Sequence, residues 1–219
     1  MRMRHHRNAT RRRFLDDRSP PDEVRRLMET AEGSDPAVWR ALSQELGLPG
    51  VQIPEEYGGQ GFGFVELGIV LEEMGRALLC APYFSSVVLA ANAILAAAHE
   101  TQKKVLLPGI ASGRTIATVA LAEDSGRWDP DGVALTASRA DGAVRLDGAK
   151  TFVLDGATAD LIIVVGRSPG SVGPEGIGLF VVPADAPGLE RRSLTALDPT
   201  RKVARIEFHG VRAEPLGEP

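Results

Sequence analysis

The sequence predicts an α+β fold in which an all-helical region is followed by a small antiparallel β-barrel. Up to residue 112, apolar residues recur at helical spacing, and after Gly113 the spacing changes to two. Turn-forming residues then separate seven short extended runs, a pattern typical of a small barrel or sandwich. We therefore expect a helical domain over residues 11–112 and a barrel domain over residues 113–219.

The helical region carries start and stop signals in order. Pro21 suits the first turn of a helix, and Asp22 suits the positive end of its dipole. Asp35 followed by proline marks a second start, and Gly47 is well placed to end that helix. Apolar and alanine-rich stretches predict further helices at residues 64–77, 82–99 and 101–111.

A glycine-rich loop interrupts these helices at residues 48–63. Its segment P-E-E-Y-G-G-Q-G-F-G, residues 54–63, has the composition of a phosphate-binding turn. A dinucleotide site requires a preceding strand and the spacing G-x-G-x-x-G, and both are missing here. A structural turn is the favoured interpretation.

Extended runs rich in β-branched and other apolar residues follow Gly113. Asp147-Gly148 is a dipeptide typical of hairpins, whereas Asp155-Gly156 and Pro187-Gly188 mark further bends. The expected strands are residues 116–122, 133–137, 144–146, 150–154, 161–165, 177–182 and 203–208.

Composition limits the classes of function. The 219 residues have a formal net charge of -4, so nothing favours a nucleic-acid partner. The single cysteine, Cys80, excludes an intrachain disulfide and favours a reducing, cytoplasmic compartment. The longest apolar stretch, residues 87–98, is too short to cross a membrane.

The N-terminus is basic, and we expect residues 1–10 to be a disordered tail. The segment T-R-R-R-F-L, residues 10–15, imitates a twin-arginine export signal. No apolar segment follows it, so a basic lead into a first helix is favoured over export. His5 and His6 could bind metal adventitiously, but the tail offers them no third ligand.

Other candidate residues have simpler structural interpretations. His99 and His209 have no acid or thiol nearby in a triad arrangement, and Glu72 and Glu73 fit a solvated helix face. No serine hydrolase, zinc or P-loop pattern is present. The residues alone therefore predict no catalytic residue and no metal site.

Several motifs together resemble one enzyme family. Residues 54–59 (P-E-E-Y-G-G) and 71–76 (L-E-E-M-G-R) resemble helical-domain segments of acyl-CoA dehydrogenases, and residues 102–113 resemble the segment that leads into their barrel. R-L-D-G-A-K-T-F-V-L-D-G, residues 145–156, is similar to the family's flavin-contacting stretch N-G-x-K-x-W-I-T-N-G. Residues 211–218 resemble the barrel's exit strand. The resemblance covers residues 11–219 and implies the family's N-terminal and middle domains, without its C-terminal helical domain.

The resemblance implies FAD as cofactor and a set of contacting residues. Leu121, Ala122 and Glu123 stand where the family usually has V-T-E-P, and their backbone would face the pyrimidine edge of the flavin. In the second motif, Phe152 would pack beside the flavin ring. Val153 and Leu154 would lie near its reactive nitrogen.

The sequence departs from the family pattern at three places. Ala122 and Leu154 each replace a threonine whose hydroxyl can bond the flavin, and one such bond contributes about 0.5–1.5 kcal/mol. Trp128 replaces a serine that approaches substrate or cofactor, so it is either a substrate-binding residue or a buried structural tryptophan. The segments at residues 126–130 and 198–202 are similar to those of divergent actinobacterial members.

The implied reaction is α,β-dehydrogenation of an acyl-CoA thioester, in fatty acid or steroid degradation. It requires a carboxylate base, which the family usually carries in its C-terminal domain, so we expect this chain to be truncated and inactive alone. The implied partners are acyl-CoA, other acyl-CoA dehydrogenase subunits in a homo- or hetero-oligomer, and electron-transfer flavoprotein or a similar acceptor. The alternative is a non-catalytic fragment or partner subunit that binds acyl-CoA or another subunit.

Overall fold

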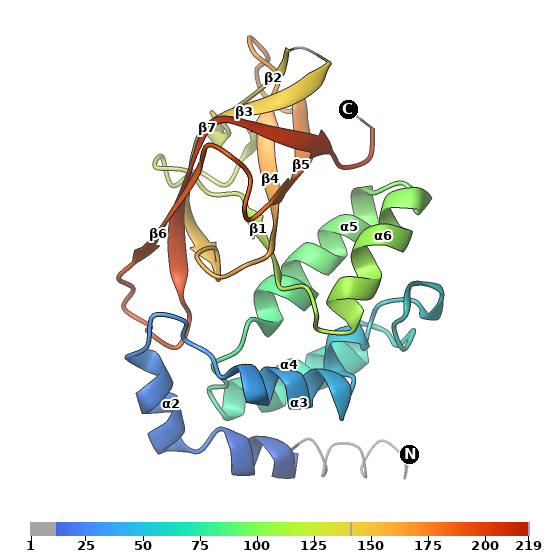
Figure 1. Cartoon of the computed structure of the whole chain (residues 1–219), viewed down its shortest axis with the longest axis vertical. Coiled ribbons are helices and arrows are strands. Elements are labelled where there is room, and N and C mark those ends of the chain that lie inside the picture. Colours follow the sequence, from blue (N-terminus) through green and yellow to red (C-terminus); the bar gives the residue numbers. More distant parts are fainter. Residues whose placement is uncertain (1–11, 141, 219) are drawn as a thin grey trace.

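A computed structural model describes residues 12–140 and 142–218 of the chain, so the predicted tail at residues 1–10 lies outside the described part. The helices form one body and the strands a second body packed on it (Figure 1). The α+β prediction is confirmed, with the helical region first and the barrel second. Among the described residues, no helix is both long and apolar enough to cross a bilayer.

The helices begin and end largely where the sequence signals stand. Asp35 accepts a hydrogen bond from the Ala37 amide at 2.7 Å, and Gly47 adopts a left-handed φ of 61° after the second helix. Residues 12–18 are also helical. The α-helices are α2 (Pro21–Met28), α3 (Pro36–Gln44), α4 (Phe64–Arg76), α5 (Ala91–Ala97) and α6 (Glu100–Ala111).

The predicted helix at residues 82–99 is not one regular α-helix. Its first part, η3 (Phe84–Ala90), is a π-helical segment, and α5 continues it. Ser85 and Ser86 are fully buried in η3, and Ser86 Oγ both donates to the Ala117 carbonyl and accepts from its amide. The segment therefore presents polar side chains to the barrel, a feature that the alanine-rich pattern did not indicate.

The loop at residues 48–63 is a structural turn made of the 3-10 helices η1 (Leu48–Gly50) and η2 (Glu55–Tyr57). A Cβ atom on Gly59 would lie 1.9 Å from the Ile53 carbonyl oxygen, so close packing explains this glycine. A 3-10 helix, and no strand, precedes the glycines. The favoured interpretation of the sequence agrees with the structure.

Five strands close into a ring in the order β4, β2, β3, β7, β5, with β5 returning to β4. β1 pairs with a second stretch of β4, and β6 pairs with a second stretch of β7. Most pairs are antiparallel, but β1–β4 and β2–β4 are parallel, so the barrel is mixed. The strands are β1 (Ala117–Ala120), β2 (Thr136–Ala140), β3 (Ala143–Leu154), β4 (Leu161–Arg167), β5 (Ile177–Pro183), β6 (Leu189–Leu194) and β7 (Val203–Pro215).

The predicted hairpin at Asp147-Gly148 is wrong. β3 runs through this dipeptide as one strand, with a register shift against β7 between Leu146 and Gly148. Gly148 has a φ of 137° and packs against the Leu135 backbone, so the strand bends around the barrel there and does not reverse. The sequence prediction also missed β6.

β4 joins the two bodies because both of its faces are buried. Ile162 belongs to the barrel core with Leu146 and Phe208, whereas Ile163 packs in a second cluster with Ile94 and other residues of the helices. Polar contacts also join the helices to later segments of the chain. They include Trp39 Nε1 to the Gly113 carbonyl at 2.8 Å, Arg201 Nη1 to the Leu79 carbonyl at 2.8 Å and Lys202 Nζ to the Met28 carbonyl at 2.7 Å.

This packing predicts that Ile163→Ala destabilises the chain as much as Ile162→Ala does. Both side chains are fully buried, and truncating a buried isoleucine costs about 2–5 kcal/mol. Val172→Ala, at a side chain that is 76% exposed, is the control and should change the free energy of unfolding by less than about 0.5 kcal/mol. Urea unfolding measures all three, and a neutral Ile163→Ala would show that the helices do not cover this face of β4.

Candidate functional site

The structure brings the two segments of the predicted flavin site together. Residues 121–123 follow β1, and residues 152–154 end β3. The Thr151 amide donates to the Ala122 carbonyl at 2.8 Å, and Lys150 Nζ donates to the Leu121 carbonyl at 3.0 Å. Segments about thirty residues apart therefore lie side by side.

A buried ion pair fixes this arrangement. Lys150 is fully buried, and its Nζ lies 2.6 Å from Glu123 Oε1. The Glu123 carboxylate also accepts hydrogen bonds from the amides of Ala134 and Leu135 at 2.9–3.0 Å. Burial lowers the pKa of Lys150, while the hydrogen bond and charge of Glu123 oppose that shift. Sequence reasoning singled out Glu123 but missed Lys150, although the lysine of the N-G-x-K motif was the available signal.

The three residues at the end of β3 point in different directions. Phe152 has a left-handed φ of 52°, and its side chain is 65% exposed. Val153 is buried in the barrel core, so only its backbone can face a ligand. Leu154 is half-buried, and its carbonyl accepts a hydrogen bond from Thr118 Oγ1 at 2.6 Å.

The chemistry of these residues fits a flavin. The carbonyl oxygens of Leu121 and Ala122 already accept hydrogen bonds from Lys150 and Thr151, so the backbone groups left to these two residues are their amides. Amide donors match the oxygens and nitrogens of a pyrimidine edge. The exposed ring of Phe152 on the neighbouring strand suits packing against an aromatic cofactor.

Trp128 is not a buried structural tryptophan. Its side chain is 79% exposed in the loop between β1 and β2. Arg127 Nη2 and Asp129 Oδ1 form an ion pair at 2.7 Å on either side of it in the sequence. This exposure rules out the buried structural interpretation, and the substrate-binding role stays a prediction.

Asp155 forms a junction that sequence reasoning did not assign. Its carboxylate accepts a hydrogen bond from Ser85 Oγ at 2.6 Å, and its amide donates to the Lys202 carbonyl at 2.8 Å. Burial raises the pKa of Asp155, against the opposing effects of Ser85 and Arg201. The residue therefore ties the end of β3 to η3 and to the β6–β7 connection.

An apolar hollow of about 230 Å³ adjoins this junction. Phe84 and Arg201, which line it, are sequence neighbours of the Asp155 partners Ser85 and Lys202. Its other lining residues are Leu71, Met74, Gly75, Leu79, Ala81 and Tyr83. The lining is suited to a hydrocarbon group.

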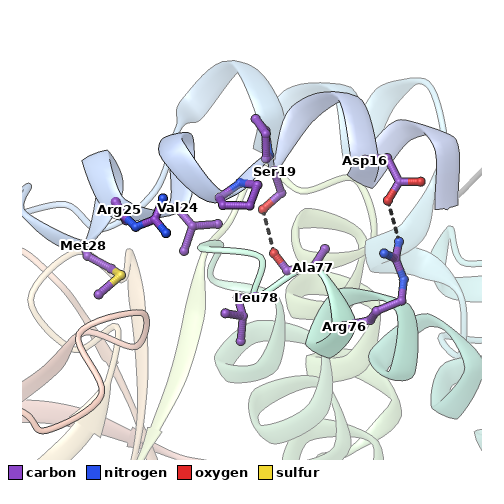
Figure 2. A pocket seen from close by; sticks show the side chains of 10 residues that line it. Asp16, Ser19, Val24, Arg25, Met28, Arg76, Ala77 and Leu78 are labelled. Carbon is purple, nitrogen blue, oxygen red and sulfur yellow. Dashed lines mark hydrogen bonds and ion pairs between the residues drawn. The ribbon is translucent and has the colours of Figure 1, made fainter.

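A larger cavity of about 430 Å³ lies elsewhere, between α2 and the end of α4 (Figure 2). Ser19 Oγ donates to the Ala77 carbonyl there at 3.1 Å, and Arg76 pairs with Asp16 at 2.8 Å. Its other arginine, Arg25, pairs with Asp22. Both cations are therefore neutralised, and none of the predicted flavin residues lines the cavity.

Two family models match the chain in succession. The acyl-CoA dehydrogenase N-terminal domain matches residues 5–114, and the acyl-CoA dehydrogenase middle domain matches residues 118–211.

Curated relatives and solved structures show the same similarity. "Acyl-CoA dehydrogenase FadE12" of Mycobacterium tuberculosis is 38% identical over 76% of this chain and 42% of its own length. Mitochondrial isovaleryl-CoA dehydrogenase of Arabidopsis thaliana is 26% identical over 90% of this chain and 47% of its own length. The chain spans less than half of these relatives.

Among solved structures, the acyl-CoA dehydrogenase of Geobacillus kaustophilus has a TM-score of 0.89 at 26% identity, covering 100% of this chain and 59% of that one. The "Tcur3481-Tcur3483 steroid ACAD G363A variant" has a TM-score of 0.85 at 31% identity, covering 97% of this chain and 56% of that one.

The buried ion pair predicts a large loss of stability when one partner is removed. Lys150→Met should lower the free energy of unfolding by about 3–5 kcal/mol, because it leaves the Glu123 charge without its cation. The double variant with Glu123→Gln should recover part of that loss, since no buried charge then remains. Lys103→Met, in the surface pair with Glu100, is the matched control and should change stability by less than about 1 kcal/mol. Equal effects of the two lysine variants in urea unfolding would contradict this account.

The raised pKa of Asp155 predicts a pH-dependent stability difference. The native state holds this proton to higher pH than the unfolded chain does, so its contribution to stability falls as pH rises from the ordinary aspartate pKa through the native one. Asn cannot ionise, keeps an oxygen for Ser85 and tolerates the φ of 52°. The melting temperature of Asp155→Asn should therefore gain on wild type between pH 4.5 and 8. A difference between Asp155→Asn and wild type that stays constant over this range would refute the prediction.

Proposed function

This chain belongs to the acyl-CoA dehydrogenase family, and from that premise we propose that it supplies the flavin-holding part of an FAD-dependent oxidoreductase. The proposed reaction is α,β-dehydrogenation of an acyl-CoA thioester. The observation that supports it most is the clamped pair of segments, residues 121–123 and 152–154, with an exposed aromatic ring beside backbone amides. A cytoplasmic location is part of the proposal and is consistent with the single free thiol of Cys80.

Each residue of the set has a separate role in this proposal. Bound FAD would accept a hydride from the β carbon of the substrate. The amides of Leu121 and Ala122 would hold the pyrimidine edge, and Phe152 would pack beside the ring. The backbone of Val153 and Leu154 would face the reactive edge, and Trp128, on its exposed loop, would contact the substrate. The apolar hollow beside Asp155 would accommodate part of the acyl group.

The base that removes the α proton is not assigned to this set. Glu123 is the carboxylate within the clamped segments, but its oxygens accept hydrogen bonds from Lys150 and two backbone amides. With its oxygens occupied by these three donors, the Glu123 carboxylate does not offer a free oxygen to a substrate proton. We therefore place the base in a further segment or partner chain, so that residues 1–219 alone would not catalyse the reaction.

A partner-subunit role is the second candidate. Two solved structures, at 28% and 30% identity, are named for two polypeptides each: the ChsE4-ChsE5 complex of Mycobacterium tuberculosis and the Tcur3481-Tcur3483 steroid ACAD. These two-polypeptide proteins support a hetero-oligomer of this chain with another acyl-CoA dehydrogenase subunit, which would hold the flavin or the base. A steroid or fatty acyl thioester is the proposed substrate class, and electron-transfer flavoprotein or a similar protein the proposed acceptor.

Flavin titration tests the proposal. We expect the purified chain to bind FAD weakly and saturably, because in the family other parts complete the site, and Phe152→Ala should weaken that binding by roughly two- to twelvefold, the loss of one aromatic pair. Phe64→Ala is the matched control, since Phe64 is 72% exposed on α4, and it should leave the affinity unchanged. Quenching of FAD fluorescence gives both dissociation constants. Equal affinities for the two variants would contradict the role of Phe152, and no saturable binding would contradict the flavin-holding role.

A further inference from the structure

The outer strand β6 carries a cluster of side chains with no part in the proposed flavin chemistry. In the described part of the chain, β6 pairs only with β7. Figure 1 shows this pair extending along the part of β7 far from the chain's C-terminus. Glu190 of β6 lies directly opposite Glu207 of β7, and cross-strand partners share a face of the sheet. His209 is two residues beyond Glu207 and so projects from the same face.

The three side chains converge at the distances that a metal ion requires. One ligand atom from each of Glu190, Glu207 and His209 lies within 4.8 Å of the other two. His209 Nε2 is 3.8 Å from Glu207 Oε2. From this spacing, small side-chain rotations would place all three ligand atoms 2.0–2.2 Å from a central zinc ion, the distance at which zinc binds imidazole nitrogen and carboxylate oxygen.

A second layer of contacts orients the central carboxylate. Arg205 Nε donates to Glu207 Oε1 at 2.8 Å, and Arg205 is itself paired with Asp124. Oε1 is therefore occupied, whereas Oε2 is the oxygen that faces His209. Outer partners that fix a ligand's orientation in this way are usual at metal sites.

A backbone contact just before β6 holds His209 in place. The His209 amide donates to the Gly188 carbonyl at 3.0 Å, so Gly188 stands across from the histidine. Gly188 has a left-handed φ of 84°, and a Cβ atom there would lie 2.4 Å from the His209 carbonyl oxygen. Close approach of the two backbones therefore explains this glycine, and the contact holds His209 beside the start of β6.

We propose that Glu190, Glu207 and His209 form a binding site for a divalent transition-metal ion of the zinc class. Two carboxylate oxygens and one imidazole nitrogen make three protein ligands, and water completes a tetrahedral set. Because the ligands come from both strands, the ion clips the outer strand β6 to β7. The site is independent of the flavin proposal.

Zinc titration of the full chain tests the site. The background is a variant in which His5 and His6 are replaced by alanine, so that tail imidazoles do not contribute. We expect one saturable Zn²⁺ site by calorimetry, with an affinity that falls at least tenfold in His209→Ala and in Glu190→Gln. His99→Ala is the matched control, because His99 is also exposed and lies 3.7 Å from a single glutamate, Glu218. Its affinity should stay within twofold of the background.

Thermal melts separate loss of the site from damage to the fold. In EDTA, His209→Ala and Glu190→Gln should melt with the background, since both side chains are exposed. Added Zn²⁺ should raise the melting temperature of the background and of His99→Ala, and should not raise that of the other two. Absence of a saturable site in the background, or equal zinc affinity in His209→Ala and His99→Ala, would overturn the proposal.

Discussion

The buried ion pair between Lys150 and Glu123 is the interaction on which the candidate site depends most. Lys150 comes from β3, Glu123 follows β1, and the amides that complete the carboxylate's shell belong to Ala134 and Leu135, just before β2. One pair of charges therefore holds three segments of the barrel in a fixed relation. Because the pair is buried, these segments cannot separate without leaving a charge unpaired in the interior, which is strongly unfavourable.

The helical body also helps to position the candidate site. The Asp155 carboxylate accepts a hydrogen bond from the Ser85 hydroxyl of η3, and its amide donates to the Lys202 carbonyl. The Lys202 ammonium in turn donates to the Met28 carbonyl of the helical body. The strand that would face the flavin is thus attached at its end to both bodies, and the apolar hollow lies beside the attachment. In the proposed function, this junction would set the position of the acyl group relative to the flavin.

The departures of this chain from its family concern side chains more than backbone. Ala122 and Leu154 have no hydroxyl, yet their carbonyl groups accept hydrogen bonds from Thr151 and Thr118, which hold both backbone segments in place. Backbone geometry can persist where side-chain chemistry has changed, because the ladder and the buried pair do not use the lost hydroxyls. In the proposed function, the flavin would therefore be held through backbone amides and not through threonine side chains.

The sequence alone determined the class of fold, the order of the two domains and the family, because periodicity, turn residues and motifs are local signals. It also identified the two segments of the candidate site. Tertiary structure decided the rest: β3 bends at Gly148 because Leu135 packs against it, β6 exists because β7 offers it an edge, and Trp128 lies exposed on its loop. Lys150 matters because it forms a buried ion pair with Glu123. His209 lies beside Glu190 and Glu207 because of the register between β6 and β7. Such contacts join residues far apart in the chain, and no local pattern encodes them.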